Sequence, residues 1–180
     1  MSYDGMFVPG DQDPRFGEPT PRGERETVRQ YLRHYRLTFS LKCEGLDAEQ
    51  LARRSVPPST MSLLGLLRHL AKVEHHWARR VIEGHADLPR LYSTDAEPDA
   101  DFDGAVADPE VVAEAWAAWR REVAHAEEVE AAVPSYDALV SHHGEEGEVR
   151  DVLVHLIEEY ARHCGHGDLL RECVDGRTGQ

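Results

Sequence analysis

Apolar residues recur at a three-and-four-residue spacing in four long stretches of the chain, a pattern typical of amphipathic helices. In the first stretch, for example, Tyr31, Leu32 and Tyr35 fall on one face. The four predicted helices cover roughly residues 24–44, 61–83, 109–133 and 148–173. The chain has neither an alternating strand pattern nor an internal repeat, so it predicts an all-α fold, a four-helix bundle of the antiparallel type.

Residues suited to helix ends flank these stretches. Gly45 is a predicted C-cap of the first helix, and Asp47, with Gln50 three residues later, predicts a capping box for a short turn of helix. Ser59 or Thr60 is the predicted N-cap of the second long helix. Side-chain chemistry thus predicts these boundaries independently of the apolar pattern.

Three segments lack helical periodicity. Residues 1–23 are rich in proline and glycine and predict an extended N-terminal arm, and residues 177–180 predict a short tail. The connection between helices two and three, residues 85–108, is acidic, is broken by prolines and is longer than most connections in compact domains. Such a long connection often lies over a site. We therefore expect one domain, a bundle of residues 24–176.

Composition limits the classes of partner. A chain of 180 residues with 41% hydrophobic content suits one core, and a formal charge of −14 disfavours nucleic acids and anionic membranes as partners. No apolar run is long enough to cross a membrane, and no signal pattern precedes the first helix. Three cysteines are an odd number and do not suggest a paired disulfide framework. We expect a cytoplasmic protein whose partners are small molecules.

A polar stripe on the fourth predicted helix carries the candidate chemistry. His155, Glu159, His163 and His166 are spaced four, four and three residues apart, so their side chains project in nearly the same direction. Burying such groups without partners is costly, and a divalent metal ion offers the most complete compensation. Glu159 and His163 can present two ligands to one ion. His69, at the border of the second helix's apolar stripe, is the predicted third ligand.

Two imidazoles and a carboxylate would leave a tetrahedral ion one open position. Zinc fits these ligands best, although nickel, iron or manganese bind the same groups. A ferritin-like di-iron centre needs two Glu-x-x-His pairs, and only Glu122 with His125 supplies one. The residues alone leave open whether an ion binds, because a single histidine such as His69 is more often a hydrogen-bonded residue of the core boundary.

The other polar residues near the stripe have less specific roles. His166 is expected to orient a ligand, whereas His155 is expected to be packed and hydrogen-bonded between helices, with a ligand role as the alternative. Arg162 and Arg171 are considered for binding an anionic substrate or cofactor, against the alternative that they only face solvent. Cys164 points about 100° away from the adjacent ligand and is expected to be a small buried residue.

Two segments carry a resemblance to a known family. They read PPSTMSLLGLLRHLAKVEHHW at residues 57–77 and HLIEEYARHCGHGDLLRE at residues 155–172. Through them the chain resembles the DinB-like superfamily, and most closely its actinobacterial mini-circle-protein branch. The resemblance implies a four-helix bundle that holds a metal with one ligand from the second helix and two from the last. The His, Glu, His set of the related mycothiol-dependent maleylpyruvate isomerase falls on His69, Glu159 and His163.

The resemblance also implies an activity. Characterised members of the superfamily join low-molecular-weight thiols, such as mycothiol or bacillithiol, to small electrophilic substrates. This implies a metal-dependent thiol transferase in which the metal-activated thiol is the nucleophile. The catalytic side chains stay unidentified, with His166 and Arg162 as candidates for supporting roles around the ligands. Many members carry His-Arg-Gly-Gln at the last ligand, whereas this chain carries His163-Cys164-Gly165-His166. The contacts of that arginine and glutamine therefore do not transfer.

Two other functions stay open at this point. One is a non-catalytic metal- or ligand-binding stress-response module that keeps the bundle and its pocket. The other is a metal-dependent hydrolase, because an ion with an open position also activates water. A homodimer is the expected oligomer only because symmetric pairs are common among soluble proteins.

Overall fold

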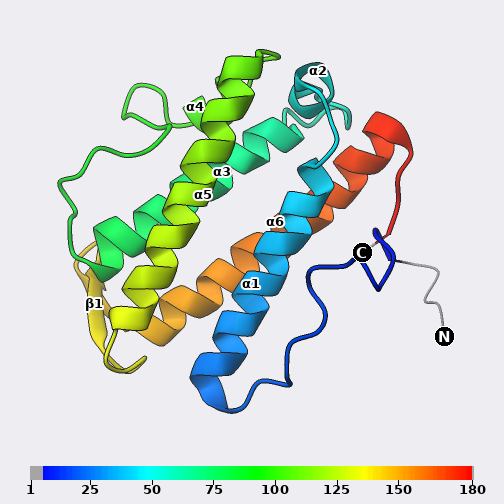
Figure 1. Cartoon of the computed structure of the whole chain (residues 1–180). Helices are drawn as coiled ribbons and strands as arrows, with labels where there is room; N and C mark the ends of the chain where they lie inside the picture. The colour runs from blue at the N-terminus through cyan, green and yellow to red at the C-terminus, as the bar shows by residue number, and fades with distance from the viewer. Residues whose placement is uncertain (1–5, 180) are drawn as a thin grey trace.

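The computed structural model, which describes residues 6–179, is a bundle of four long helices (Figure 1). The prediction of an all-α fold is confirmed. The long helices are α1 (Gly23–Cys43), α3 (Leu63–His75) with its π-helical continuation η1 (His76–Ile82), α5 (Pro109–Ala132) and α6 (Val149–Asp175). The short elements are α2 (Ala48–Ala52), α4 (Ala100–Asp103), β1 (Leu139–His142) and β2 (Glu145–Glu148). Helix α3 packs against α5 and α6, and α1 packs against α6.

Of the two helix N-caps predicted above, the structure confirms the one at α2 and not the one at α3. Asp47 and Gln50 form the predicted capping box at the start of α2. The prediction of Ser59 or Thr60 as the cap of α3 is wrong, because the Ser62 side chain accepts the hydrogen bond from Gly65. The Ser59 hydroxyl instead accepts a hydrogen bond from the backbone amide of Met61, in a turn that precedes α3, so the helix begins later than predicted.

A short hairpin between α5 and α6 was not predicted from the sequence. Strands β1 and β2 pair antiparallel, with Leu139 opposite Glu148 and His142 opposite Glu145. His143 and Gly144 form the turn with φ angles of 55° and 83°, as a two-residue turn of this kind requires. The sequence did not predict these strands because their residues do not alternate between apolar and polar.

A network of buried polar side chains crosses the main apolar core. The guanidinium of Arg36 on α1 donates to both oxygens of Glu74 on α3, at 2.8 and 2.9 Å. The Tyr160 hydroxyl on α6 donates to Glu74, and Trp119 on α5 donates to Tyr160. Glu74 and Tyr160 are fully buried. These hydrogen bonds therefore link all four long helices at one level of the bundle.

The two ends of the described chain meet beside α1. Phe7 is buried, and the charged groups of Lys42 and Arg177 lie 4.2 and 3.8 Å from the centre of its ring. Figure 1 shows the C-terminal segment beside the N-terminal one. Of the predicted arm, residues 1–5 lie outside the described residues, as does Gln180 of the predicted tail.

Arg171 does not have the anion-binding position considered for it. Its buried guanidinium donates to the carbonyl oxygens of Lys42 and Glu44 and to the Asp175 carboxylate. It thus joins the end of α6 to the end of α1. None of the helices in residues 6–179 is long and apolar enough to span a membrane.

Candidate metal centre

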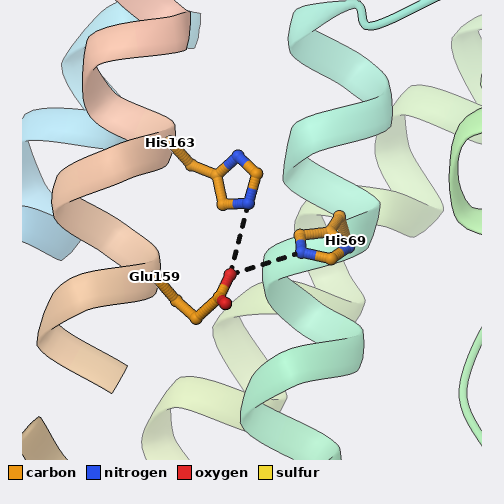
Figure 2. A group of neighbouring side chains, drawn as sticks. All are labelled: His69, Glu159 and His163. Carbon is orange, nitrogen blue, oxygen red and sulfur yellow. Dashed lines mark ion pairs between the residues drawn. The ribbon is translucent and has the colours of Figure 1, made fainter. Parts of the chain in front are cut away.

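Three side chains predicted as metal ligands converge between α3 and α6. Figure 2 shows His69 on α3 pointing across to Glu159 and His163 on α6. The Glu159 Oε2 atom lies 3.3 Å from His163 Nε2 and 3.7 Å from His69 Nε2. One potential ligand atom from each residue lies within 4.8 Å of the other two. Two helices far apart in the sequence therefore bring three donor groups to one point.

The spacing of these atoms suits a shared ion. Tetrahedral zinc binds nitrogen and oxygen at about 2.0–2.2 Å, so two of its ligand atoms lie about 3.4 Å apart. The two contacts of Glu159, at 3.3 and 3.7 Å, bracket that separation. His163 is buried, and the side chains of His69 and Glu159 are only 20% and 16% exposed. Glu159 is therefore at ligand spacing from both histidines, and since all three donor atoms lie within 4.8 Å of one another, small side-chain movements would let them share one ion.

A buried carboxylate fixes the tautomer of His69. Its Nδ1 atom lies 2.9 Å from Oδ2 of Asp101 on α4. An ionised carboxylate only accepts hydrogen bonds, so Nδ1 carries a proton, and when the ring is neutral its Nε2 lone pair is free to bind a cation. That Nε2 atom is the one that faces Glu159. The Phe102 ring, stacked at 5.2 Å, further limits rotation of the imidazole.

Asp101, the partner of His69, lies in the connection between η1 and α5. Arg68 on α3 donates to the backbone oxygens of Ala100 and Asp101, and Lys72 donates to the Asp101 carboxylate at 3.0 Å. Asp101 is fully buried. The sequence predicted that this connection lies over a site but did not single out Asp101. One acidic residue in an acidic loop has no periodicity to mark it.

Asp101→Asn is expected to weaken metal binding about 10- to 100-fold, because the amide no longer enforces the protonated Nδ1 of His69. Competition against a zinc chelator measures the affinity. Asp103→Asn is the matched control, because Asp103 is exposed on the same short helix. An unchanged affinity in Asp101→Asn would show that Asp101 does not orient the histidine.

His166 contacts the second histidine of the cluster. Its Nδ1 atom lies 3.2 Å from His163 Nδ1, while His163 Nε2 faces Glu159. Burial and the neighbouring His163 lower the pKa of His166, which keeps its ring neutral, so that its Nδ1 atom can accept a hydrogen bond from His163 Nδ1. The contact therefore suits the orienting role predicted for His166.

The electrostatics of the cluster favour a bound cation. Hydrogen bonds from His163 and His69 hold the pKa of Glu159 far below its ordinary value, even though burial opposes them. Burial raises the pKa of Asp101, but hydrogen bonds from His69 and Lys72 outweigh it and lower the pKa. Both carboxylates are therefore ionised at neutral pH. Burial lowers the pKa of His69, but its contacts with Asp101 and Glu159 outweigh burial and raise the pKa. Beside Lys72, the two carboxylates therefore favour a further positive charge at this point, either a proton on His69 or a bound cation in its place.

The other residues considered from the sequence lie around the cluster. His155 is 40% exposed, packs against the Trp77 ring at 4.9 Å and has Nε2 3.7 Å from Glu159 Oε1. It thus packs against η1 from α6, but its side chain is partly exposed and the 3.7 Å contact with Glu159 is longer than the hydrogen bond that was expected. Cys164 is buried, and burial raises the pKa of its thiol to about 12. Arg162 is exposed on α6.

The single Glu-x-x-His pair of the sequence does not form a second metal centre. Glu122 accepts hydrogen bonds from Arg79 and Arg121 and lies 3.4 Å from His75 Nδ1, whereas His125 pairs with Glu83. Burial raises the pKa of Glu122, but the hydrogen bonds from its three partners outweigh burial and lower it to about 2. Glu122 therefore has a structural role.

Ionised Glu122 should stabilise the fold in a pH-dependent way. Since its pKa is about 2 in the folded chain and 4.5 ordinarily, its stabilisation is complete well above pH 4.5 and is lost as the pH falls towards 2. Glu122→Gln is expected to lower the free energy of unfolding at pH 7 by on the order of 2 kcal/mol. Urea unfolding at pH 7 and pH 3 should show this difference shrinking at the lower pH. An equal loss at both values, or a similar loss in exposed Glu128→Gln, would contradict the assignment.

Comparison with known proteins gives one match. A family model described as mycothiol-S-transferase matches residues 27–176. No curated protein and no solved structure matches the chain. The matched range covers most of the chain and includes all three residues of the cluster.

Proposed function

Because the chain belongs to the mycothiol-S-transferase family, we propose that it transfers a mycothiol-like thiol to a small electrophile at a metal ion held by His69, Glu159 and His163. The convergence of these three side chains between α3 and α6 is the observation that carries the proposal. Zinc is the proposed ion, because two imidazoles and a carboxylate are a common ligand set for catalytic zinc. The same His, Glu, His pattern is the ligand set implied by the resemblance to the mycothiol-dependent maleylpyruvate isomerase of the DinB-like superfamily.

The ion would supply one chemical function: it lowers the pKa of a thiol enough to give the thiolate nucleophile at neutral pH. The protein residues do the rest. His69 and His163 bind through Nε2 as neutral imidazoles, with the proton of His69 held on Nδ1 by Asp101. Glu159 contributes one negative charge, so the three ligands leave a divalent ion with a net positive charge that attracts a thiolate.

The chain's own cysteines are poor candidates for the nucleophile. Burial raises the pKa of Cys43 beyond the physiological range and that of Cys164 to about 12. Cys173 is exposed near the end of α6, nearly three turns beyond His163. A thiol brought by a co-substrate therefore explains the site better than a protein thiol does. Arg162 on α6 is the proposed contact for an anionic group of that co-substrate.

A cobalt-substituted sample tests the proposal. The protein is purified without a histidine tag, loaded with Co²⁺ and titrated with mycothiol or a short thiol analogue. We expect sulfur-to-cobalt charge-transfer bands in the wild-type protein and none in Glu159→Gln, with bands retained in the control Glu128→Gln. A cobalt spectrum that thiol leaves unchanged would reject thiol activation and favour a binding module or a hydrolase.

A further inference from the structure

A second group of histidines lies where the hairpin meets η1, apart from the cluster already described. His76 Nε2 on η1 lies 3.1 Å from His142 Nε2 on β1. The ring of His143 lies 4.2 Å from that of His142, and the Trp77 ring lies 4.8 Å from His142. His76 and His142 are 66 positions apart in the sequence. The proposed transferase site uses none of them.

The local backbone directs these side chains toward one another. Neighbouring strand residues normally point to opposite faces, but His143 has a φ of 55° and turns its ring back toward His142. Glu145 lies opposite His142 in the hairpin and therefore shares its face. On the other side, His76 begins a π-helical turn, a rare geometry that is frequent at functional sites.

The two facing nitrogens are suited to binding a cation. Burial and the neighbouring His142 lower the pKa of His76 to about 4, so its ring is neutral at physiological pH. Burial and His143 also lower the pKa of His142. Two imidazole nitrogens bound to one tetrahedral ion at about 2.0–2.1 Å would lie about 3.3 Å apart. The observed separation of 3.1 Å is close to that value.

We propose that His76 and His142 form a second binding site for a divalent transition-metal ion such as Zn²⁺. The side chain of His143, exposed at the turn, would rotate to supply a third ligand, because only the two facing nitrogens already have ligand spacing. Neutral imidazoles favour ions of this class over Mg²⁺ or Ca²⁺. Because the ligands come from η1 and from the hairpin, a bound ion would join the hairpin to the end of the helix that carries His69. The alternative is a simple hydrogen bond between two neutral rings.

Zinc stoichiometry tests the second site separately from the first. All proteins carry Cys173→Ser, which removes the exposed thiol, and lack a histidine tag. Equilibrium dialysis against Zn²⁺ is expected to give about two equivalents in this parent protein, as two independent sites of this ligand type require. His142→Gln should lose one equivalent and keep the other. His163→Gln should lose the other and keep the one at the hairpin.

Two further variants complete the experiment. His76→Gln is expected to match His142→Gln, which guards against a folding defect in the hairpin variant. The control His85→Gln, an exposed histidine that follows η1, should keep both equivalents. One equivalent in the parent protein that His142→Gln and His76→Gln both retain would overturn the proposal. Loss of binding only in His163→Gln would overturn it while leaving the proposed function intact.

Discussion

Replacing His163 by alanine is expected to reduce bound metal from about one equivalent at the transferase site to a small fraction, because two ligands do not hold zinc as three do. Thiol transfer should fall with it. His163 Nε2 lies 3.3 Å from Glu159 Oε2 at the centre of the cluster, and His163 is buried. Mass spectrometry of the metal content, with helical content followed by circular dichroism, measures the effect.

A matched control separates loss of a ligand from loss of any histidine. His125→Ala removes an imidazole from α5 that pairs with Glu83 instead, so metal content and activity should remain. Binding at the hairpin histidines is counted separately by adding His142→Gln to both proteins. Full metal occupancy in His163→Ala with His142→Gln would contradict the ligand assignment.

Removing Arg36 is expected to have the largest effect on stability. Its guanidinium donates twice to Glu74, and the side chains of Arg36 and Glu74 are 8% and 0% exposed. Arg36→Met leaves the Glu74 carboxylate buried without its cation, which costs about 3–5 kcal/mol. For a chain of this size the melting temperature should fall by roughly 10 °C. Thermal unfolding followed by circular dichroism measures the shift.

The double variant Arg36→Met with Glu74→Gln tests the cause. It removes both charges but keeps a side-chain oxygen for the Tyr160 hydroxyl to donate to, so most of the lost stability should return. Arg54→Ala is the control, because Arg54 and its partner Asp103 are 47% and 75% exposed, and exposed pairs contribute little. A double variant as unstable as Arg36→Met alone would show that packing, not the buried charge, is lost.

The apolar pattern was enough to predict the long helices, because each buries one stripe against its neighbours. It also predicted that His69, Glu159 and His163 share a location, since polar residues on a core-facing stripe need partners. The pattern could not predict Asp101, which reaches His69 only because Arg68 and Lys72 hold the loop backbone and side chain against α3. Such contacts depend on tertiary structure.

The hairpin and the π-helical turn were missed for a related reason. Residues 139–148 are mostly polar and exposed, so no buried face imposes a period of two. The proximity of His76 to His142 follows from both features together. The sequence shows the histidines of this region, but only the fold shows that two of them face each other.

Crystals of the protein grown with zinc, measured on both sides of the zinc absorption edge, test the metal assignment directly. The account predicts an anomalous peak between α3 and α6, about 2.0–2.2 Å from Nε2 of His69, Nε2 of His163 and an oxygen of Glu159. A zinc-soaked crystal with no peak at that point, while the three side chains keep their positions, would contradict it.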